Sequence, residues 1–461
     1  MDRFTEPGGE SSRSDRTPRR AAELSRWRLG LFVTMVAVLP IHTVFLSAWI
    51  SWKPFLVALI VLVMMDLGAG GRARTWPWHG AATIASGAFL AMVLIGWPTP
   101  AYFDRFARLF LALVVGVLIL LVTERSLRPP GMIERTLRVV FWSGAAMALT
   151  GLAASLVLVG GLGSQTLDVV NDLPGVFRIA KPAYLKSGFV ALSNWHQDPG
   201  YGAAWANLWA VLALVAGARK PVSGRWWLDG AVMGGLAFTV AMAFSRTGWL
   251  VLPIAMGVTS WLLVRHGRIS PGLIGRRLGA GVVAATLMLA AVWLVDVPDR
   301  GGDLDLQFSF RFSQGLDLLA SITGLFEPSE RFADAFDVSE ERADVWPEYL
   351  TMFREQPWTG VGLSVGWQTN SIGQEPHNLV LELLAETGVV GTSAFLVLLV
   401  LLLARGGGVS GRAALFVSLL PFMTQTILFE PTWWFAGGLL LAGGAGRTDP
   451  PGMPGLVEDL L

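Results

Sequence analysis

The sequence predicts an all-α polytopic membrane protein with about twelve transmembrane helices and one large, partly helical outer loop between the ninth and the tenth. Two observations lead to this fold class. Hydrophobic residues make up 53% of the 461 positions and charged residues only 15%, whereas about a quarter of a soluble domain is charged. The apolar residues also fall into long runs separated by short arginine-bearing joints. The chain cannot cover itself with a charged surface, so we expect lipid to cover its apolar runs.

Windows of about 20 apolar residues, bounded by proline, glycine or charge, define the expected helices. They cover residues 29–49, 54–70, 79–97, 103–123, 137–161, 200–218, 226–244, 247–264, 278–296, 377–404, 413–429 and 432–446. The expected order of regions is a cytoplasmic tail (1–28), helices one to nine (29–296), the outer loop (297–376), helices ten to twelve (377–446) and a second cytoplasmic tail (447–461).

Lysine and arginine set the expected orientation, because they gather on the cytoplasmic side of membrane proteins. With the N-terminal tail inside, 23 of the 35 basic residues lie on the cytoplasmic side, and every short cytoplasmic joint is basic. The first apolar run is too long for a cleaved signal peptide, so we expect it to remain as an anchor.

The charge pattern excludes several classes of function. The outer loop 297–376 holds 14 acidic and 5 basic residues, while the net charge of the chain is +1. No clustered basic face indicates a nucleic-acid partner. The absence of cysteine excludes disulfides, thiolate metal sites and a cysteine nucleophile. Asp303 and Asp305 resemble a metal-binding pair, but their acidic surroundings favour a solvated loop, so no metal site is predicted.

Arg246 is the first candidate for a functional residue. It lies in the tight outer turn between two expected helices, with no acidic residue nearby in the sequence. A guanidinium is planar and always charged, which suits a phosphate or a diphosphate. The alternative is an interfacial arginine whose head reaches water.

The second candidate is the start of the tenth expected helix. Asn378, Glu382 and Glu386 follow at intervals of four residues and form one polar stripe along an apolar helix. Such a stripe must face the protein interior or a wet cavity. His377 precedes it at the helix N-terminus, where a histidine can act as a general base, donate to a phosphate or merely cap the helix.

The third candidate is Arg342 with Trp346, which would share one face of a helix through both positions. Pro347 predicts a kink or a helix start there. The glycine run 357–366 resembles a nucleotide loop only loosely, because no Gly-Lys-Ser/Thr follows it. We predict a tight turn that returns the chain to the membrane.

Together these segments resemble the O-antigen ligase and O-antigen polymerase family of bacterial envelope enzymes. The matching residues are the turn at 245–248, Arg342 with Trp346, Pro357-x-x-Gly360-x-Gly362, Pro376-His377-Asn378 and Glu386-x-Gly388-x-x-Gly391. A weaker match is Lys186, where relatives often carry arginine. The matched motifs cover mainly residues 180–395.

The resemblance implies a metal-independent, inverting glycosyltransferase of the bacterial inner membrane that needs no cofactor and whose site faces outward. Its donor would be a glycan linked to undecaprenyl diphosphate, and its acceptor a glycan or a lipid such as the lipid A core. Arg246 and Arg342 would hold the diphosphate, and His377 would deprotonate the acceptor hydroxyl or orient the diphosphate. The substrate-binding residues would be Arg178, Lys186, Trp346, Asn378 and Glu386.

Other functions stay open from the sequence. Within the family, the protein could instead polymerise repeat units or transfer glycan to a protein. A lipid-linked glycan flippase or secondary transporter would predict internal repeats and broken helices at mid-membrane, and neither pattern is visible. The sequence leaves the oligomeric state open.

Overall fold

The structure is a computed structural model of the full chain. It describes residues 16–41, 44–47, 50–68, 81–96, 102–159, 184–186, 189–191, 199–295, 345–371, 373, 375–376, 378–423 and 427–444.

Helices dominate the described residues. The elements before residue 200 are α1 (Arg16–Val38), β1 (Val44–Ser47), β2 (Ile50–Trp52), α2 (Pro54–Gly68), α3 (Ala81–Ile95), α4 (Phe103–Leu127), α5 (Met132–Val159), β3 (Tyr184–Lys186), β4 (Phe189–Ala191) and α7 (Pro199–Ala216). Those that follow are α8 (Trp226–Met242), α9 (Arg246–Arg265), α10 (Pro271–Leu294), α13 (Val345–Glu355), α14 (Val365–Thr369), α15 (Leu379–Arg405), α16 (Val409–Leu419), the 3-10 helices η5 (Leu420–Met423) and η6 (Ile427–Phe429), and α17 (Pro431–Gly444).

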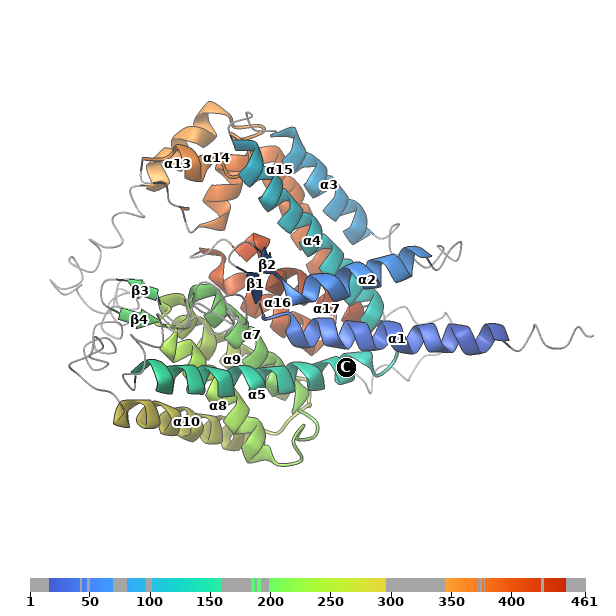
Figure 1. Ribbon diagram of the computed structural model, residues 1–461, viewed down its shortest axis with the longest axis vertical. Coiled ribbons are helices and arrows are strands. Elements are labelled where there is room, and N and C mark those ends of the chain that lie inside the picture. Colours follow the sequence, from blue (N-terminus) through green and yellow to red (C-terminus); the bar gives the residue numbers. More distant parts are fainter. Residues whose placement is uncertain are drawn as a thin grey trace, which may run out of the picture.

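The helices form two packed groups joined through a central layer. Figure 1 shows α3, α13, α14 and α15 at one end of the molecule and α5, α8 and α10 at the other. Helices α7 and α17 carry fully buried tryptophans between these ends, and the rings of Trp205 and Trp209 meet edge to face at 4.9 Å. Large aromatic residues therefore fill the centre of the bundle.

Helices α8 and α10 pack with their backbones in direct contact. A Cβ atom added to Gly234 would lie 2.1 Å from the carbonyl oxygen of Gly281, so the two backbones touch directly. Small residues permit this approach, which is typical of helices packed within a membrane.

Five helices of the described part are long and apolar enough to cross a membrane: Phe103–Leu127, Met132–Leu156, Thr247–Arg265, Pro271–Leu294 and Leu379–Arg405. Further apolar helices are shorter, among them α2, α3, α7, α8 and α16. Many large apolar side chains on these helices are exposed, such as Leu287 and Leu403. The protein has the character of a multi-pass membrane protein, and the count of twelve spans stays a prediction.

Each expected span overlaps an observed helix, but two of them end differently. The expected helix at 29–49 is wrong in its second half, because α1 stops at Val38 and residues 44–47 pair with 50–52 as an antiparallel hairpin. Pro40 supplies the physical reason, since proline lacks a donor and disfavours helix in the residue before it. A second hairpin, β3 with β4, lies between the expected helices at 137–161 and 200–218. The all-α fold class is confirmed, and the two short hairpins are additions to it within the described residues.

The expected helix at 413–429 is also interrupted. Helix α16 ends at Leu419, and the short 3-10 helices η5 and η6 follow it. Pro421 cannot donate a backbone hydrogen bond, which disfavours continuation of the α-helix at this point. The outer loop 297–376 is described only from Val345 onward, as α13, α14 and the turns around them.

Candidate functional site: a loop seated in a kinked helix

Helix α15 is kinked at Gly388, and the loop that joins α13 to α14 sits in the kink. Gly388 adopts φ +63° and ψ −169° inside an otherwise regular helix. The loop and the helix exchange backbone hydrogen bonds, namely Val361 N to Ala385 O (2.9 Å), Gly362 N to Glu386 O (3.0 Å), Val389 N to Pro357 O (2.8 Å) and Val390 N to Trp358 O (3.1 Å). The kink leaves backbone N–H and C=O groups of α15 without partners inside the helix, and the loop provides the missing hydrogen bonds.

Glycine is required on both sides of this contact. A Cβ atom on Gly388 would lie 2.4 Å from the backbone carbon and oxygen of Trp358. A Cβ atom on Gly360 would lie 2.3 Å from the backbone carbon of Glu386, and Gly360 has φ +69°. The glycine run 357–366 therefore contains a tight turn, as predicted. This turn packs against the Glu386-x-Gly388 part of α15.

The polar stripe of α15 faces the interior of the protein, as the sequence predicted. Asn378, Glu382 and Glu386 are all buried. The side-chain oxygen of Asn378 accepts a hydrogen bond from Leu381 N at 3.1 Å, so Asn378 is the residue that caps the helix.

Glu386 holds the turn that begins α14. Its carboxylate accepts the backbone N–H of Ser364 at 2.7 Å, and both residues are buried. Ser364 has φ +71°, a conformation that is uncommon for residues other than glycine. This hydrogen bond between two buried groups stabilises a strained turn.

A narrow pocket lies beside the stripe. Its lining residues are Leu363, Leu379, Glu382, Leu383, Glu386, Thr387, Leu428 and Phe429. It has room for about one water molecule. Two carboxylates thus border one small space under the loop, between α15 and η6.

Helix α13 covers the start of α15. The indole N–H of Trp346 donates to the carbonyl oxygen of Pro376 at 2.9 Å. Tyr349 is fully buried beside Leu381 and Ala385, against the backbone of Gly366. Burial raises the pKa of the Tyr349 phenol, and nearby carboxylates raise it further, so this ring stays neutral.

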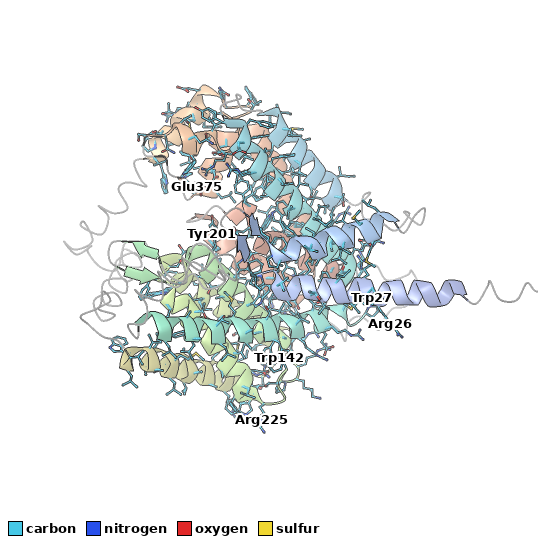
Figure 2. The ribbon with its side chains drawn as sticks, in the orientation of Figure 1. Arg26, Trp27, Trp142, Tyr201, Arg225 and Glu375 are labelled. Atoms are coloured by element: carbon cyan, nitrogen blue, oxygen red, sulfur yellow. The ribbon has the colours of Figure 1, made fainter. Side chains whose placement is uncertain are left out.

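Arg105, in the first turn of α4, joins the site from a distant part of the chain. Its Nη2 lies 3.3 Å from the Oε1 of Glu375, and its guanidinium carbon lies 3.1 Å from the ring centre of Trp367. Figure 2 shows Glu375 at the end of the molecule that α13 and α14 form. Arg105 is not among the site residues predicted from the sequence. The one available signal was that it is an arginine at the outer end of an apolar span.

The structure describes only part of the predicted set of site residues. Trp346, Asn378 and Glu386 lie around the start and the kink of α15. Arg246 is the first residue of α9, after the capping residue Ser245, whose hydroxyl accepts Gly248 N at 3.2 Å. Lys186 ends strand β3. The side chains of Arg246 and Lys186, and the whole of Arg178, Arg342 and His377, lie outside the described residues.

Within the described ranges, no three side chains of His, Cys, Asp or Glu are grouped as metal ligands. The described polar groups around α15 include carboxylates, an amide, backbone amides, hydroxyls and the guanidinium of Arg105. These groups bind hydroxyls and anions by hydrogen bonding and charge.

The fold and this site define a class, a multi-pass membrane protein with buried polar groups at one end of its helices. Residues 231–396 match the family model described as O-antigen ligase. No curated protein matches the chain. The match runs from α8 past the kink of α15, so it includes Arg246, Arg342 and His377 and excludes Arg105. The resemblance stated from the motifs is thereby confirmed, and it indicates a membrane enzyme of the ligase or polymerase type that processes glycans.

Proposed function

We propose that this protein transfers a glycan from undecaprenyl diphosphate to an acceptor hydroxyl, as an O-antigen ligase acting on the lipid A core or a similar acceptor. The observation that carries the proposal is the O-antigen ligase match over 231–396. It coincides with the part of the chain where the glycine loop, the kinked helix and its buried polar stripe pack together.

Arg246 and Arg342 are assigned to the donor in this proposal. A diphosphate leaving group gains negative charge as the bond between the sugar C1 and the phosphate oxygen breaks. Two guanidinium groups neutralise that charge through bidentate hydrogen bonds, so no metal ion or cofactor is needed.

His377 is assigned to the acceptor. Its imidazole takes the proton of the acceptor hydroxyl, and the acceptor oxygen forms the new bond to C1 while undecaprenyl diphosphate leaves. One displacement of this kind inverts the anomeric centre. Asn378, Glu386, Trp346, Lys186 and Arg178 are assigned to substrate binding. For Glu386 and Trp346, the hydrogen bonds to Ser364 and Pro376 support an indirect part as well, because they shape the segments around the site.

The proposed location is the bacterial inner membrane, with the site facing the outside. The five candidate spans and the excess of basic residues on one side of the expected topology support this location. The partners are then the lipid-linked donor, the glycan or lipid acceptor and the surrounding lipids.

A polymerase that joins repeat units on the same lipid carrier is the second candidate, because the matched family supports both reactions. The surface glycan of a deletion strain separates the two. Full-length chains that remain on the lipid carrier indicate a ligase, whereas single repeat units indicate a polymerase.

The assignment of residues is tested by Arg246→Ala, Arg342→Ala and His377→Ala in a complemented deletion strain. Each variant should insert into the membrane at the wild-type level and lose glycan transfer. Arg354→Ala is the matched control, since Arg354 is an exposed arginine at the end of α13. Normal glycan length and linkage in all three variants would refute the mechanism.

A further inference from the structure

Glu375, which lies two residues before His377 in the sequence, forms an ion pair with a residue of α4 that lies 270 positions earlier. The side chain of Arg105 in α4 pairs with Glu375 at 3.3 Å. The same guanidinium stacks on Trp367, which belongs to α14. An arginine can do both at once, because its planar group offers a face to an aromatic ring and an edge to a carboxylate.

The residues on both sides of position 377 are held by three different elements. Arg105 of α4 holds Glu375, and the indole of Trp346 in α13 holds the carbonyl of Pro376 at 2.9 Å. On the other side, Asn378 caps α15 through Leu381 N at 3.1 Å. Of these contacts, only the one from Arg105 comes from outside the segment that matches the O-antigen ligase family.

Most of the Arg105 side chain is covered, with 24% of its surface exposed. Its charge is opposed by Glu375 and by the buried carboxylates Glu382 and Glu386 at longer range. This guanidinium contacts Glu375 along one edge and Trp367 with one face. It is well placed to fix the peptide that carries Glu375.

We propose that Arg105 is a positioning residue for glycan transfer, and that its ion pair with Glu375 and its stacking on Trp367 fix Glu375 and Pro376, which directly precede the proposed acceptor base in the sequence. This inference rests on the proposed function for its consequence in catalysis. The structural part of the inference, that these residues are fixed in place, rests only on the contacts of Arg105, Trp346 and Asn378.

The test uses purified full-length protein in liposomes, with undecaprenyl-diphosphate-linked repeat units as donor and lipid A core as acceptor. The variants are Arg105→Ala, Arg105→Lys and Glu375→Gln. The matched control is Arg108→Ala, because Arg108 lies one turn further along α4 and makes only an exposed pair with Asp104 among its described ion pairs. Two quantities are measured: kcat and KM for the donor, and hydrogen exchange of peptides that span 373–381.

We expect Arg105→Ala and Glu375→Gln to lower kcat by about 100-fold, the effect of misplacing a reacting group by about 1 Å. KM for the donor should stay unchanged, and exchange in 373–381 should become faster. Arg105→Lys should restore part of kcat, because it keeps the charge near Glu375 and loses the planar stacking. Arg108→Ala should match the wild type in both measurements. If Arg105→Ala fails to fold, Glu375→Gln carries the same comparison, since it keeps the shape of the side chain.

Three results are decisive. Wild-type kcat and wild-type exchange in both Arg105→Ala and Glu375→Gln overturn the inference and leave the proposed function standing. A raised donor KM with an unchanged kcat also overturns it, because Arg105 would then bind the diphosphate directly. If the wild-type protein transfers no glycan while Arg105→Ala still speeds exchange in 373–381, the proposed function fails and the structural hold is supported.

Discussion

Replacing Gly388 by alanine should destabilise the protein and slow glycan transfer. The backbone of Gly388, at φ +63° and ψ −169°, lies in a region that essentially only glycine occupies. The new Cβ atom would lie 2.4 Å from backbone atoms of Trp358 and 2.6 Å from the nitrogen of Gly360. No side-chain rotation relieves such a clash, because all of these atoms belong to the backbone.

The expected magnitude has two parts. Backbone strain at such a position costs about 1–3 kcal/mol. Moving the 357–362 loop away from α15 weakens the four backbone hydrogen bonds between them, each of which contributes about 1 kcal/mol. If half of these bonds are lost, the free energy of unfolding falls by about 3–5 kcal/mol.

The assay is thermal unfolding of the purified protein in one detergent, together with glycan transfer in liposomes. The control is Gly257→Ala in α9, where an added Cβ atom would meet nothing within 4 Å. Alanine is the better helix former there by about 1 kcal/mol, so the control should unfold at or above the wild-type temperature. If Gly388→Ala unfolds at the temperature of the control and transfers glycan at its rate, the account of the kink is wrong.

Three further predictions follow from other parts of the protein. Asp229→Asn should lower the free energy of unfolding by about 3–5 kcal/mol, because it leaves Arg277 buried without its counter-charge; an unchanged melting temperature would contradict this. Trp346→Phe should cost about 1 kcal/mol by removing the hydrogen bond to Pro376, and it should slow transfer without changing the yield of folded protein on size exclusion. A chelator should leave the rate of glycan transfer unchanged, since the proposed mechanism neutralises the diphosphate with guanidinium groups; loss of activity that added Mg²⁺ restores would count against it.

Local patterns in the sequence were sufficient for much of the helical architecture. Each apolar run in the sequence overlaps an observed helix. Such runs are readable from the sequence because a helix that spans a bilayer needs about 20 apolar residues whatever its neighbours are. The stripe of Asn378, Glu382 and Glu386 was also predictable, since positions four apart share one face of a helix. The failures fall at Pro40 and Pro421, where the apolar run continues although proline disfavours a continued helix.

The composition and the order of residues thus determined that this is a helical protein with the character of a membrane protein, that it resembles O-antigen ligases, and which helix face is polar. Only the tertiary structure decided which distant residues meet. It packed the 357–362 loop into the kink at Gly388 and placed the backbone N–H of Ser364 within hydrogen-bond distance of Glu386. It also paired Arg105 with Glu375, although 270 positions separate them in the sequence. The reason is physical: periodicity reports the faces of a single helix, whereas contacts between helices depend on how those faces pack, and no local pattern encodes that.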